Sequence, residues 1–280
     1  MAAFASVPAF VQLAAHPVRW QLLTTLSGGD HRVRELAALV REPQNLVSYH
    51  LRVLRDGGLV TTTRSTFDGR DTYYHLDVDR CGGMLADVGT ALHPALAPAT
   101  ERPPPGPPGS VSVLFVCTGN SSRSPIAEAL LRRHCDLTAS DGVEILSAGT
   151  HPKAEIHALA VRVLRDDFGI DISTRAPLSL AAVSDHRFDA VVTLCDKARE
   201  HCPEFDDDTR CIHWSIPDPA ATQHNDADTY PAFRAVAADI ATRVRHLLPA
   251  IARRHRCESS VARAAEGRNP KCPTEEKSVR

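Results

Sequence analysis

Cys117 and Arg123, a cysteine and an arginine six residues apart, are the side chains of this sequence best suited to anion chemistry. The apolar residues 113–116 predict a buried strand, and residues 124–132, which open with Ser-Pro, predict a helix. In a loop between a strand and a helix N-terminus, backbone amides and the helix dipole bind tetrahedral oxyanions and favour a thiolate. An arginine fork holds two anion oxygens, so the segment predicts attack by Cys117 on phosphate or a phosphate-like anion. The alternative is a structural cysteine beside a surface arginine.

The loop resembles the low-molecular-weight tyrosine phosphatase fold family, whose members share the loop sequence C-T-G-N-x-x-R-S. The resemblance implies that Cys117 is the nucleophile, that Asn120 supports the loop and that the Ser124 hydroxyl stabilises the thiolate. Ser122 is a departure, because many relatives have a cysteine there, although that cysteine is not one of the relay thiols. The residues expected to bind the oxyanion are Thr118, Gly119, Asn120, Ser121, Ser122, Arg123 and Ser124.

Cys195 directly follows residues 189–194, Asp-Ala-Val-Val-Thr-Leu, which predict another buried strand. Strands alternate with helices in this half of the chain, so we expect a parallel sheet that binds ligands at the carboxyl ends of its strands. Cys117 and Cys195 each follow such an end and are expected to face one crevice. Cys202 lies seven residues further on, and a set of thiols can supply two electrons by disulfide exchange, which a phosphatase does not need.

Asp218, in the run Asp-Pro-Ala, favours a reductase over a phosphatase. Tyrosine phosphatases of the fold family usually follow Asp-Pro with tyrosines, whereas the thioredoxin-coupled arsenate reductases have Asp-Pro-Ala together with paired cysteines. The resemblance covers residues 111–248 and implies that Cys117 attacks arsenate while Asp218 protonates the departing oxygen. It also implies that Cys195 and Cys202 pass a disulfide outward to an external thiol reductant, thioredoxin, with no tightly bound cofactor.

Several alternatives stay open for these residues. Cys195 and Cys202 are either relay thiols, two buried structural cysteines, or members of a zinc site with Cys211 and His213. The domain as a whole is either a reductase, a protein tyrosine phosphatase in which water attacks a phosphocysteine, or a DNA-linked oxyanion sensor without turnover. Cys135 and Cys211 are otherwise expected in the core.

The first part of the chain has the pattern of three short helices followed by a hairpin. The helices are expected at about residues 11–26, 33–40 and 43–56, and the hairpin strands at 59–64 and 72–76, around Asp68-Gly69. This order predicts a winged helix-turn-helix. Residues 48–60 resemble the ArsR/SmtB family of metal-responsive repressors, and the match runs from Leu13 to Leu76. The resemblance implies a homodimer joined by the first and last helices, the last one from residues 81–92.

The third helix of this domain is expected to enter the major groove of an operator DNA. The candidate DNA contacts are Gln44, Asn45, Ser48, Tyr49 and Arg52 on that helix and Arg64 and Arg70 on the hairpin. Arsenite sensors of the family often carry Cys-x-Cys in the first helix of the motif, and residues 33–40 contain no cysteine. Cys81, Cys257 and Cys272 are either inert or the ligands of trivalent arsenic, which favours sulfur. The alternative is a winged helix used for protein contacts.

Length and composition agree with two domains in one chain. The chain has 280 residues, more than one core usually holds, and a formal net charge of −2. We expect an α/β protein: a mostly helical winged helix-turn-helix over 1–97, a proline-rich linker over 98–110, a parallel-sheet phosphatase-like domain over 111–256 and a disordered tail over 257–280. No apolar run reaches the roughly 20 residues of a membrane span, and we see no secretory signal, so the expected location is the cytoplasm.

Overall fold

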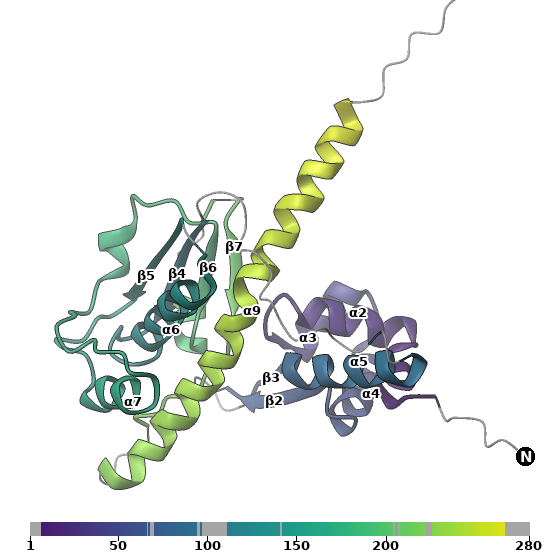
Figure 1. The fold of residues 1–280 in the computed structure, drawn as a ribbon, viewed down its shortest axis with the longest axis horizontal. Coiled ribbons are helices and arrows are strands. Elements are labelled where there is room, and N and C mark those ends of the chain that lie inside the picture. The colour runs from purple at the N-terminus through teal and green to yellow at the C-terminus, as the bar shows by residue number, and fades with distance from the viewer. Residues whose placement is uncertain are drawn as a thin grey trace, which may run out of the picture.

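The computed structural model divides into two parts (Figure 1), and each half of the chain has its own cluster of buried apolar side chains. The smaller cluster runs from Phe10 to Val60 and the larger from Val111 to Ile251. The structure describes residues 7–65, 67, 70–93, 96, 111–140, 142–203, 205–206, 208–221 and 226–266, without the side chains of 226–228 and 252–266. The predicted linker, residues 98–110, lies outside the described residues.

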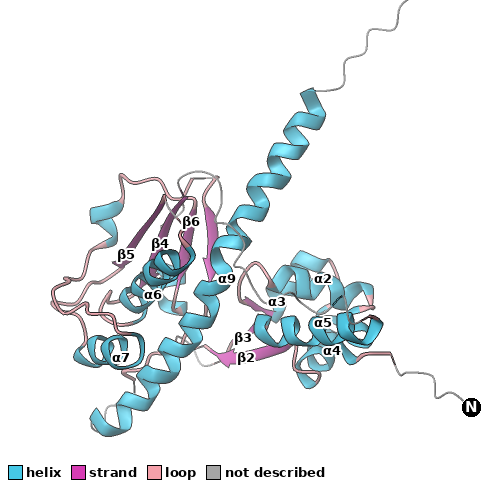
Figure 2. Ribbon diagram, in the orientation of Figure 1, coloured by secondary structure: helices cyan, strands magenta, loops and turns pink. Residues whose placement is uncertain are grey.

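Short helices make up most of the N-terminal half (Figure 2). They are α1 (Ala9–Ala14), α2 (Pro17–Leu26), α3 (Val33–Val40), α4 (Gln44–Asp56) and α5 (Val78–Leu92). The prediction of one helix over residues 11–26 is wrong, because the chain forms α1 and α2 there. Pro17 disfavours helical backbone at the preceding residue, and His16 is extended, so a new helix begins with Pro17 at its first position.

The strands of a small antiparallel sheet flank the helix-turn-helix formed by α3 and α4. Its strands β1 (His31–Arg32), β2 (Val60–Arg64) and β3 (Thr72–Leu76) lie in the order β1-β3-β2. Tyr73 of β3 pairs with Arg32 on one side and with Thr63 on the other. We call residues 60–76, the hairpin of β2 and β3, the wing. The predicted turn residues Asp68 and Gly69 lie outside the described residues.

A four-stranded parallel sheet, in the order β5-β4-β6-β7, organises the C-terminal half. Its strands are β4 (Val111–Cys117), β5 (Val143–Gly149), β6 (Ala190–Thr193) and β7 (Arg210–His213). The predicted α/β class is thereby confirmed. β7 has no counterpart among the predicted strands, because it is only four residues long and begins with the charged Arg210 and the exposed Cys211.

Helices pack against this sheet (Figure 1). They are α6 (Arg123–Thr138), α7 (Ala158–Phe168), α8 (Asp196–His201), α9 (Asp226–Glu266) and the 3₁₀ helix η2 (Leu180–Val183). α6 packs against both α9 and β5, and α7 packs against α9. In the described part of the chain, no helix combines the length and the apolarity that crossing a bilayer requires.

The end of α9 contradicts the prediction of a disordered tail from residue 257. The helix continues through the predicted domain boundary at residue 256 to Glu266. Ala262, Ala264 and Ala265 are the strongest helix formers, and their propensity outweighs the polar composition from which disorder was predicted. Residues 267–280 lie outside the described residues.

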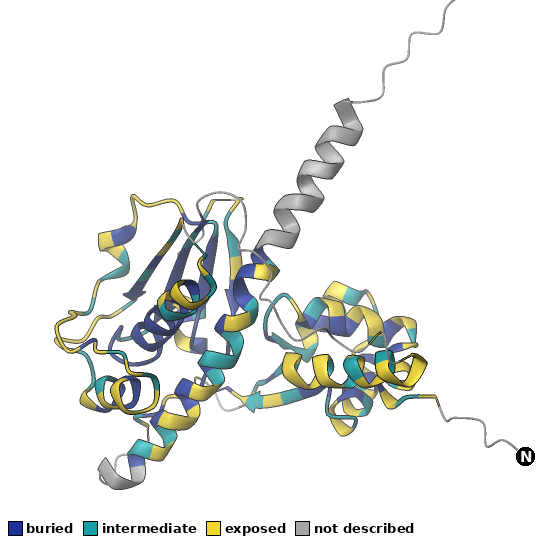
Figure 3. Cartoon of the chain, in the orientation of Figure 1, coloured by how far each residue is buried: buried dark blue, intermediate teal, exposed yellow. Residues whose placement is uncertain are grey.

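A buried carboxylate, that of Asp30, joins the two halves. Asp30 is 3% exposed and accepts hydrogen bonds from the backbone N of Ser215 (2.9 Å) and from Nη1 of Arg243 (3.0 Å). Its own backbone N donates to the carbonyl oxygen of His213 (2.8 Å). Figure 3 shows α9, which carries Arg243, running between the sheet and the N-terminal helices. The N-terminal half therefore rests on the carboxyl-end side of β7 through fixed polar contacts.

Candidate active site

The loop that follows β4 closes around buried polar side chains. Cys117 is the last residue of β4 and is 2% exposed, and Arg123 begins α6 and is 6% exposed. Between them Asn120 has a left-handed backbone with φ of 43°, which turns the chain toward the helix. The strand, the loop and the helix N-terminus thus lie together as the sequence predicts, and the loop amides lie within the field of the α6 dipole.

Asn120 supports the loop from inside. Its side-chain Nδ2 donates to the hydroxyls of Ser124 and Ser147, both at 2.9 Å, and its Oδ1 accepts from the backbone N of Leu178 at 2.7 Å. Ser147 in turn donates to Oε2 of the buried Glu128 at 2.7 Å. These bonds tie the loop to β5 and α6, so the anion site is rigid before any ligand arrives.

Arg123 faces Asp218 across the mouth of the loop. Its Nη2 lies 3.3 Å from Oδ2 of Asp218, and its Nη1 donates to the carbonyl oxygen of Ile216 at 3.1 Å. Its Nε is buried and has no hydrogen-bond partner among the described residues. A buried guanidinium with an unused donor fits an anion in the loop, because such a ligand would satisfy it. The side chain of Asp218 is 43% exposed and is therefore accessible to solvent.

A cavity of about 520 Å³ lies over this loop. Its walls are Phe67, Cys117, Thr118, Gly119, Ser121, Ser122, Arg123, His151, Lys153, His157, Cys195, Lys197, Asp218, Ala220 and Ala221. The structure therefore brings together four of the five predicted catalytic residues and most of the predicted oxyanion-binding residues. Asn120 and Ser124 lie behind the loop and support it, as the hydrogen bonds above show.

Sequence reasoning missed several of these walls. His151 and Lys153 follow the carboxyl end of β5, which is where a parallel sheet presents ligand-binding residues, so their position directly after the segment 143–149 was an available signal. Lys197 lies in the first turn of α8, a helix too short for periodicity to reveal. Phe67 belongs to the wing, and no signal within the C-terminal half could have indicated it.

The predicted relay thiols lie at the two ends of α8. Cys195 is 2% exposed, and its Sγ lies 3.3 Å from Oγ1 of Thr118 in the anion loop. Cys202 is half-buried at the other end of α8 and does not line the cavity. Burial and the neighbouring thiols Cys211 and Cys195 raise the pKa of Cys202 to about 11. Cys202 is therefore a protonated thiol at neutral pH in this conformation.

The remaining thiols separate into buried and exposed ones. Cys135 is 8% exposed and belongs to the core, as expected, whereas the prediction of a core position for Cys211 is wrong. Cys211 is exposed because β7 is the edge strand of the sheet. Within the described residues, no group of three or more His, Cys, Asp or Glu side chains is arranged to hold a metal ion. The alternative zinc site of Cys195, Cys202, Cys211 and His213 is therefore not formed in this structure.

The candidate arsenic ligands are only partly described. Cys81 is half-buried against the N-terminal core, and its Sγ approaches the carbonyl oxygen of Leu59 at 3.9 Å. Burial, with the nearby Asp77, raises the pKa of Cys81 to about 11, which disfavours the thiolate that binds a metal. The side chain of Cys257 and all of Cys272 lie outside the described residues.

The predicted DNA contacts lie on one face of α4 and on the wing. On α4, Val47, Leu51 and Leu54 are buried, whereas the candidate DNA contacts are exposed or half-buried. The exposed ones are Gln44, Asn45, Tyr49 and Arg52, with Ser48 half-buried, and Arg64 and Arg70 of the wing are exposed as well. Because the apolar face of α4 is used in the core, most polar side chains of the opposite face are exposed.

The parallel sheet, the thiol at a strand end and the arginine-closed amide loop define an α/β protein of cysteine-based oxyanion chemistry, joined to a winged helix-turn-helix. Comparison with known families agrees with both halves. The chain belongs to the low molecular weight phosphotyrosine protein phosphatase family, whose model matches residues 112–257, and residues 16–62 match the model of the arsR family of bacterial regulatory proteins.

Curated relatives match the C-terminal half. An arsenate reductase of Halalkalibacterium halodurans is 31% identical over 133 residues, which cover 48% of this chain and 91% of the relative. An arsenate reductase of Bacillus subtilis is 32% identical over 136 residues, with the same shares of 48% and 91%. Among solved structures, an arsenate reductase from Archaeoglobus fulgidus is 28% identical, with a TM-score of 0.40 over 49% of this chain and 98% of that one.

Proposed function

We propose that the chain is an arsenate reductase with a cysteine nucleophile and a thiol relay, fused to an arsenic-responsive transcriptional repressor. The observation that supports the enzyme most is that Cys117, Cys195, Arg123 and Asp218 line one cavity over an amide loop. A phosphatase needs no second thiol in that cavity, and the curated relatives named above are arsenate reductases. We place the reaction in the cytoplasm, where thiols are kept reduced.

In the first step of the proposed reaction, arsenate lies on the loop amides with Arg123 as its clamp. The Cys117 thiolate attacks arsenic and forms an S–As bond, and the departing oxygen leaves as water after accepting a proton from Asp218. Nη2 of Arg123 lies 3.3 Å from Oδ2 of Asp218, so the Asp218 carboxyl group lies beside the anion site. Arsenic stays pentavalent in this step, since no electrons have moved from the protein.

The second step uses Cys195. Its thiolate attacks the sulfur of Cys117, the electron pair of the S–As bond passes to arsenic, and trivalent arsenite leaves. The two sulfurs are oxidised to a disulfide, which balances the two electrons that arsenic gains. Thr118, which contacts Cys195 at 3.3 Å and follows Cys117 in the chain, keeps the two thiols on the same side of the loop.

The third step, in which Cys202 attacks Cys195 and frees Cys117, requires α8 to open. The two cysteines flank a helix of six residues and are seven positions apart in the sequence. At the rise per residue of an α-helix, their Cα atoms are separated by about 10 Å. A disulfide needs Cα atoms roughly 4–7 Å apart, so α8 must unwind before Cys195 and Cys202 can join. Unwinding also exposes Cys202 and makes its thiolate accessible. Thioredoxin would then reduce the exposed disulfide.

For the N-terminal domain we propose a homodimer that binds operator DNA. α5 has no buried residue within the described chain, and it presents Leu85 (50% exposed) and Leu92 (73% exposed) to its surroundings. α1 packs beside α5 and exposes Val11. An apolar face built from the first and last helices is suited to a second copy of the domain, which would place two α4 helices in successive major grooves.

The test of the enzyme is an arsenate reduction assay with the purified full chain. NADPH oxidation is followed in the presence of thioredoxin and thioredoxin reductase, and separately with glutathione and glutaredoxin, while aryl phosphate hydrolysis is measured in parallel. We expect arsenate-dependent NADPH oxidation that is faster with thioredoxin. Aryl phosphate hydrolysis without any arsenate-dependent oxidation would establish the phosphatase alternative instead, and binding of oxyanion without either reaction would establish the sensor.

A further inference from the structure

The wing of the N-terminal domain reaches the anion cavity of the C-terminal domain. Phe67, in the turn between β2 and β3, lines the same cavity as Cys117 and Arg123. Every other described residue that lines this cavity comes from the C-terminal half. The winged helix therefore contributes one wall of the enzyme's pocket, although about 50 residues of chain separate Phe67 from Cys117.

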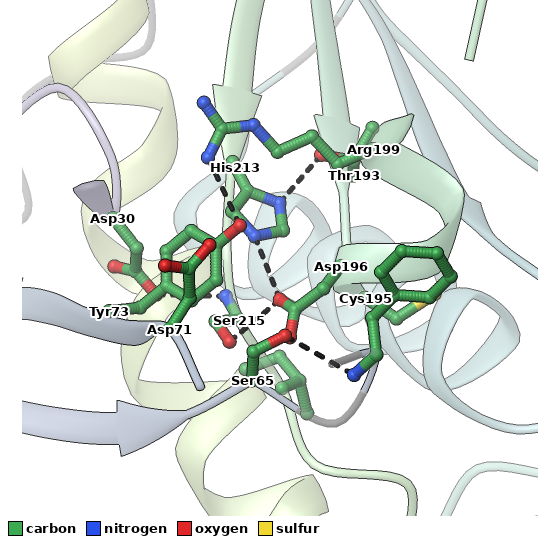
Figure 4. A network of polar contacts seen from close by, with 12 residues as sticks. Asp30, Ser65, Asp71, Tyr73, Thr193, Cys195, Asp196, Arg199, His213 and Ser215 are labelled. Carbon is green, nitrogen blue, oxygen red and sulfur yellow. Dashed lines mark hydrogen bonds and ion pairs between the residues drawn. The ribbon is translucent and has the colours of Figure 1, made fainter. Parts of the chain in front are cut away.

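Hydrogen bonds hold the wing turn in place over this cavity (Figure 4). The Ser65 hydroxyl bonds to the carboxylate of Asp196, the residue that follows Cys195, and Ser65 is only 7% exposed. The same hydroxyl oxygen accepts from the backbone N of Phe67 at 3.2 Å, which fixes the turn that presents the ring. The placement of Phe67 is thus tied directly to the segment that carries Cys195.

Asp196 is itself rigidly held. Its Oδ1 accepts from Nε2 of His213 at 3.1 Å and from the Ser215 hydroxyl at 2.8 Å, and His213 bonds to Thr193 through Nδ1 at 2.8 Å. Burial alone would raise the pKa of Asp196, but hydrogen bonds from His213, Ser65 and Ser215 lower it to about 2. The carboxylate is therefore ionised at neutral pH and is a strong acceptor for the wing.

The strands of the wing are anchored as well. Arg199 of α8 donates to Tyr73 at 3.4 Å and to Oε1 of Glu35 at 2.9 Å, and Tyr73 is 1% exposed. Arg32 of β1 pairs with Asp71, just before β3, at 2.9 Å, and with Glu200 of α8 at 3.5 Å. The wing and the neighbouring β1 are therefore attached to α8 through Ser65, Tyr73 and Arg32.

The Phe67 ring lies near two histidine rings. Its centroid lies 6.3 Å from that of His201, edge to face, and the His201 ring lies 6.3 Å from that of His151. His201 belongs to α8 and is not a wall of the cavity, whereas Phe67 and His151 both line it. Phe67 is 53% exposed, so its ring faces solvent as well as the cavity. A group attached to a bound anion would share this cavity with Phe67 and His151.

We propose that Phe67 is a specificity-determining residue that limits the pocket to small inorganic oxyanions and disfavours aryl phosphate esters. An inorganic tetrahedral anion is held by the loop and Arg123 alone and does not extend toward Phe67. An ester carries a ring on one oxygen, and that ring must occupy the space between Phe67 and the loop. The proposal rests on the proposed arsenate chemistry and deepens it, because it explains why a member of a phosphatase family would exclude phosphotyrosine-like substrates.

The test uses ligand affinities in the full chain with Cys117→Ser, so that neither ligand reacts. Isothermal titration gives the Kd of inorganic phosphate and of phenylphosphonate, and the ratio of the two is compared among variants. Phe67→Ala should improve the affinity for phenylphosphonate relative to phosphate at least fivefold, and Phe67→Trp should worsen it. Leu39→Ala, which removes an exposed apolar side chain of the same domain outside the cavity, is the matched control and should leave the ratio unchanged.

An unchanged ratio in both Phe67 variants overturns the proposal, and so does a failure of the parent protein to bind phosphate. Circular dichroism of each variant excludes unfolding, and Phe67→Leu retains an apolar side chain if the alanine variant is unstable. The result is separable from the proposed function, because arsenate turnover is measured with Cys117 intact. A protein that reduces no arsenate but shows the expected ratio would refute the reductase and retain the specificity role.

Discussion

The Sγ atom of Cys117 lies 3.0 Å from the hydroxyl oxygen of Ser124, and both side chains are buried. Asn120 donates to the same hydroxyl oxygen at 2.9 Å. Because Asn120 occupies an acceptor position of the oxygen, the hydroxyl proton is free to point at sulfur, and its other acceptor, the carbonyl of Ala148, is distant at 3.5 Å. The serine is thus arranged to donate a hydrogen bond to the Cys117 thiolate.

Replacement of Ser124 by alanine should therefore slow the chemistry of Cys117. A hydrogen bond to a charged group contributes about 1.5–3 kcal/mol, so alkylation by iodoacetamide at neutral pH and arsenate turnover should both fall by about tenfold or more. Ser184→Ala, at the exposed end of η2, is the control and should leave both rates intact. Equal alkylation rates in the two variants would show that Ser124 does not stabilise the thiolate.

Removal of the third thiol should trap the proposed relay at its second step. In Cys202→Ser, one equivalent of arsenate should leave a disulfide between Cys117 and Cys195, and turnover with thioredoxin should stop after that event. Peptide mapping after a single turnover detects the disulfide. Cys211→Ser removes an exposed thiol near Cys202 and should still turn over. Free thiols at both positions after one turnover would rule out the relay.

The stability of the protein should decline in acid through Asp196. The folded-state pKa of this carboxyl is about 2, below the roughly 3.9 of an unfolded chain. A lowered folded pKa contributes stability that is present above pH 4 and is lost as the pH falls toward 2. Urea unfolding at pH 7, 4 and 3 should show that decline, and Asp196→Asn should flatten it while losing about 1–3 kcal/mol at pH 7. A variant as acid-sensitive as the parent would assign the effect to other carboxylates.

Arg52 should be needed for operator binding. It lies exposed on α4, whose opposite face is buried, and its guanidinium is suited to a phosphate or a guanine edge. Arg52→Ala should weaken binding to an imperfect palindrome by about 1–3 kcal/mol in a gel-shift titration. Arg162 is an exposed arginine on α7, and Arg162→Ala is the matched control.

Addition of arsenite should release the DNA, and Cys81→Ser tests whether that thiol takes part.

Much of the candidate site was predictable because it is local in sequence. The anion loop is one continuous segment between a buried strand and a helix, and its thiol, its arginine and its supporting asparagine occupy fixed places along it. Cys195 was predicted from its position after a strand, whereas Asp218 was assigned through the resemblance to the fold family. Hydrophobic patterns likewise predicted β4, β6 and the three helices of the winged domain, apart from the break before Pro17.

Only the tertiary structure determined which residues of the two halves contact each other. Ser65 and Asp196 bond across more than a hundred residues of chain, and Asp30 accepts from Arg243 across more than two hundred. Such contacts depend on how two separately packed cores dock. Docking is determined by the shape and charge of whole surfaces, and no periodic pattern along the chain predicts these properties. The sequence by itself therefore determined a thiol-based anion loop and a winged helix, whereas the folded protein determined that Phe67 of the wing is a wall of the anion cavity.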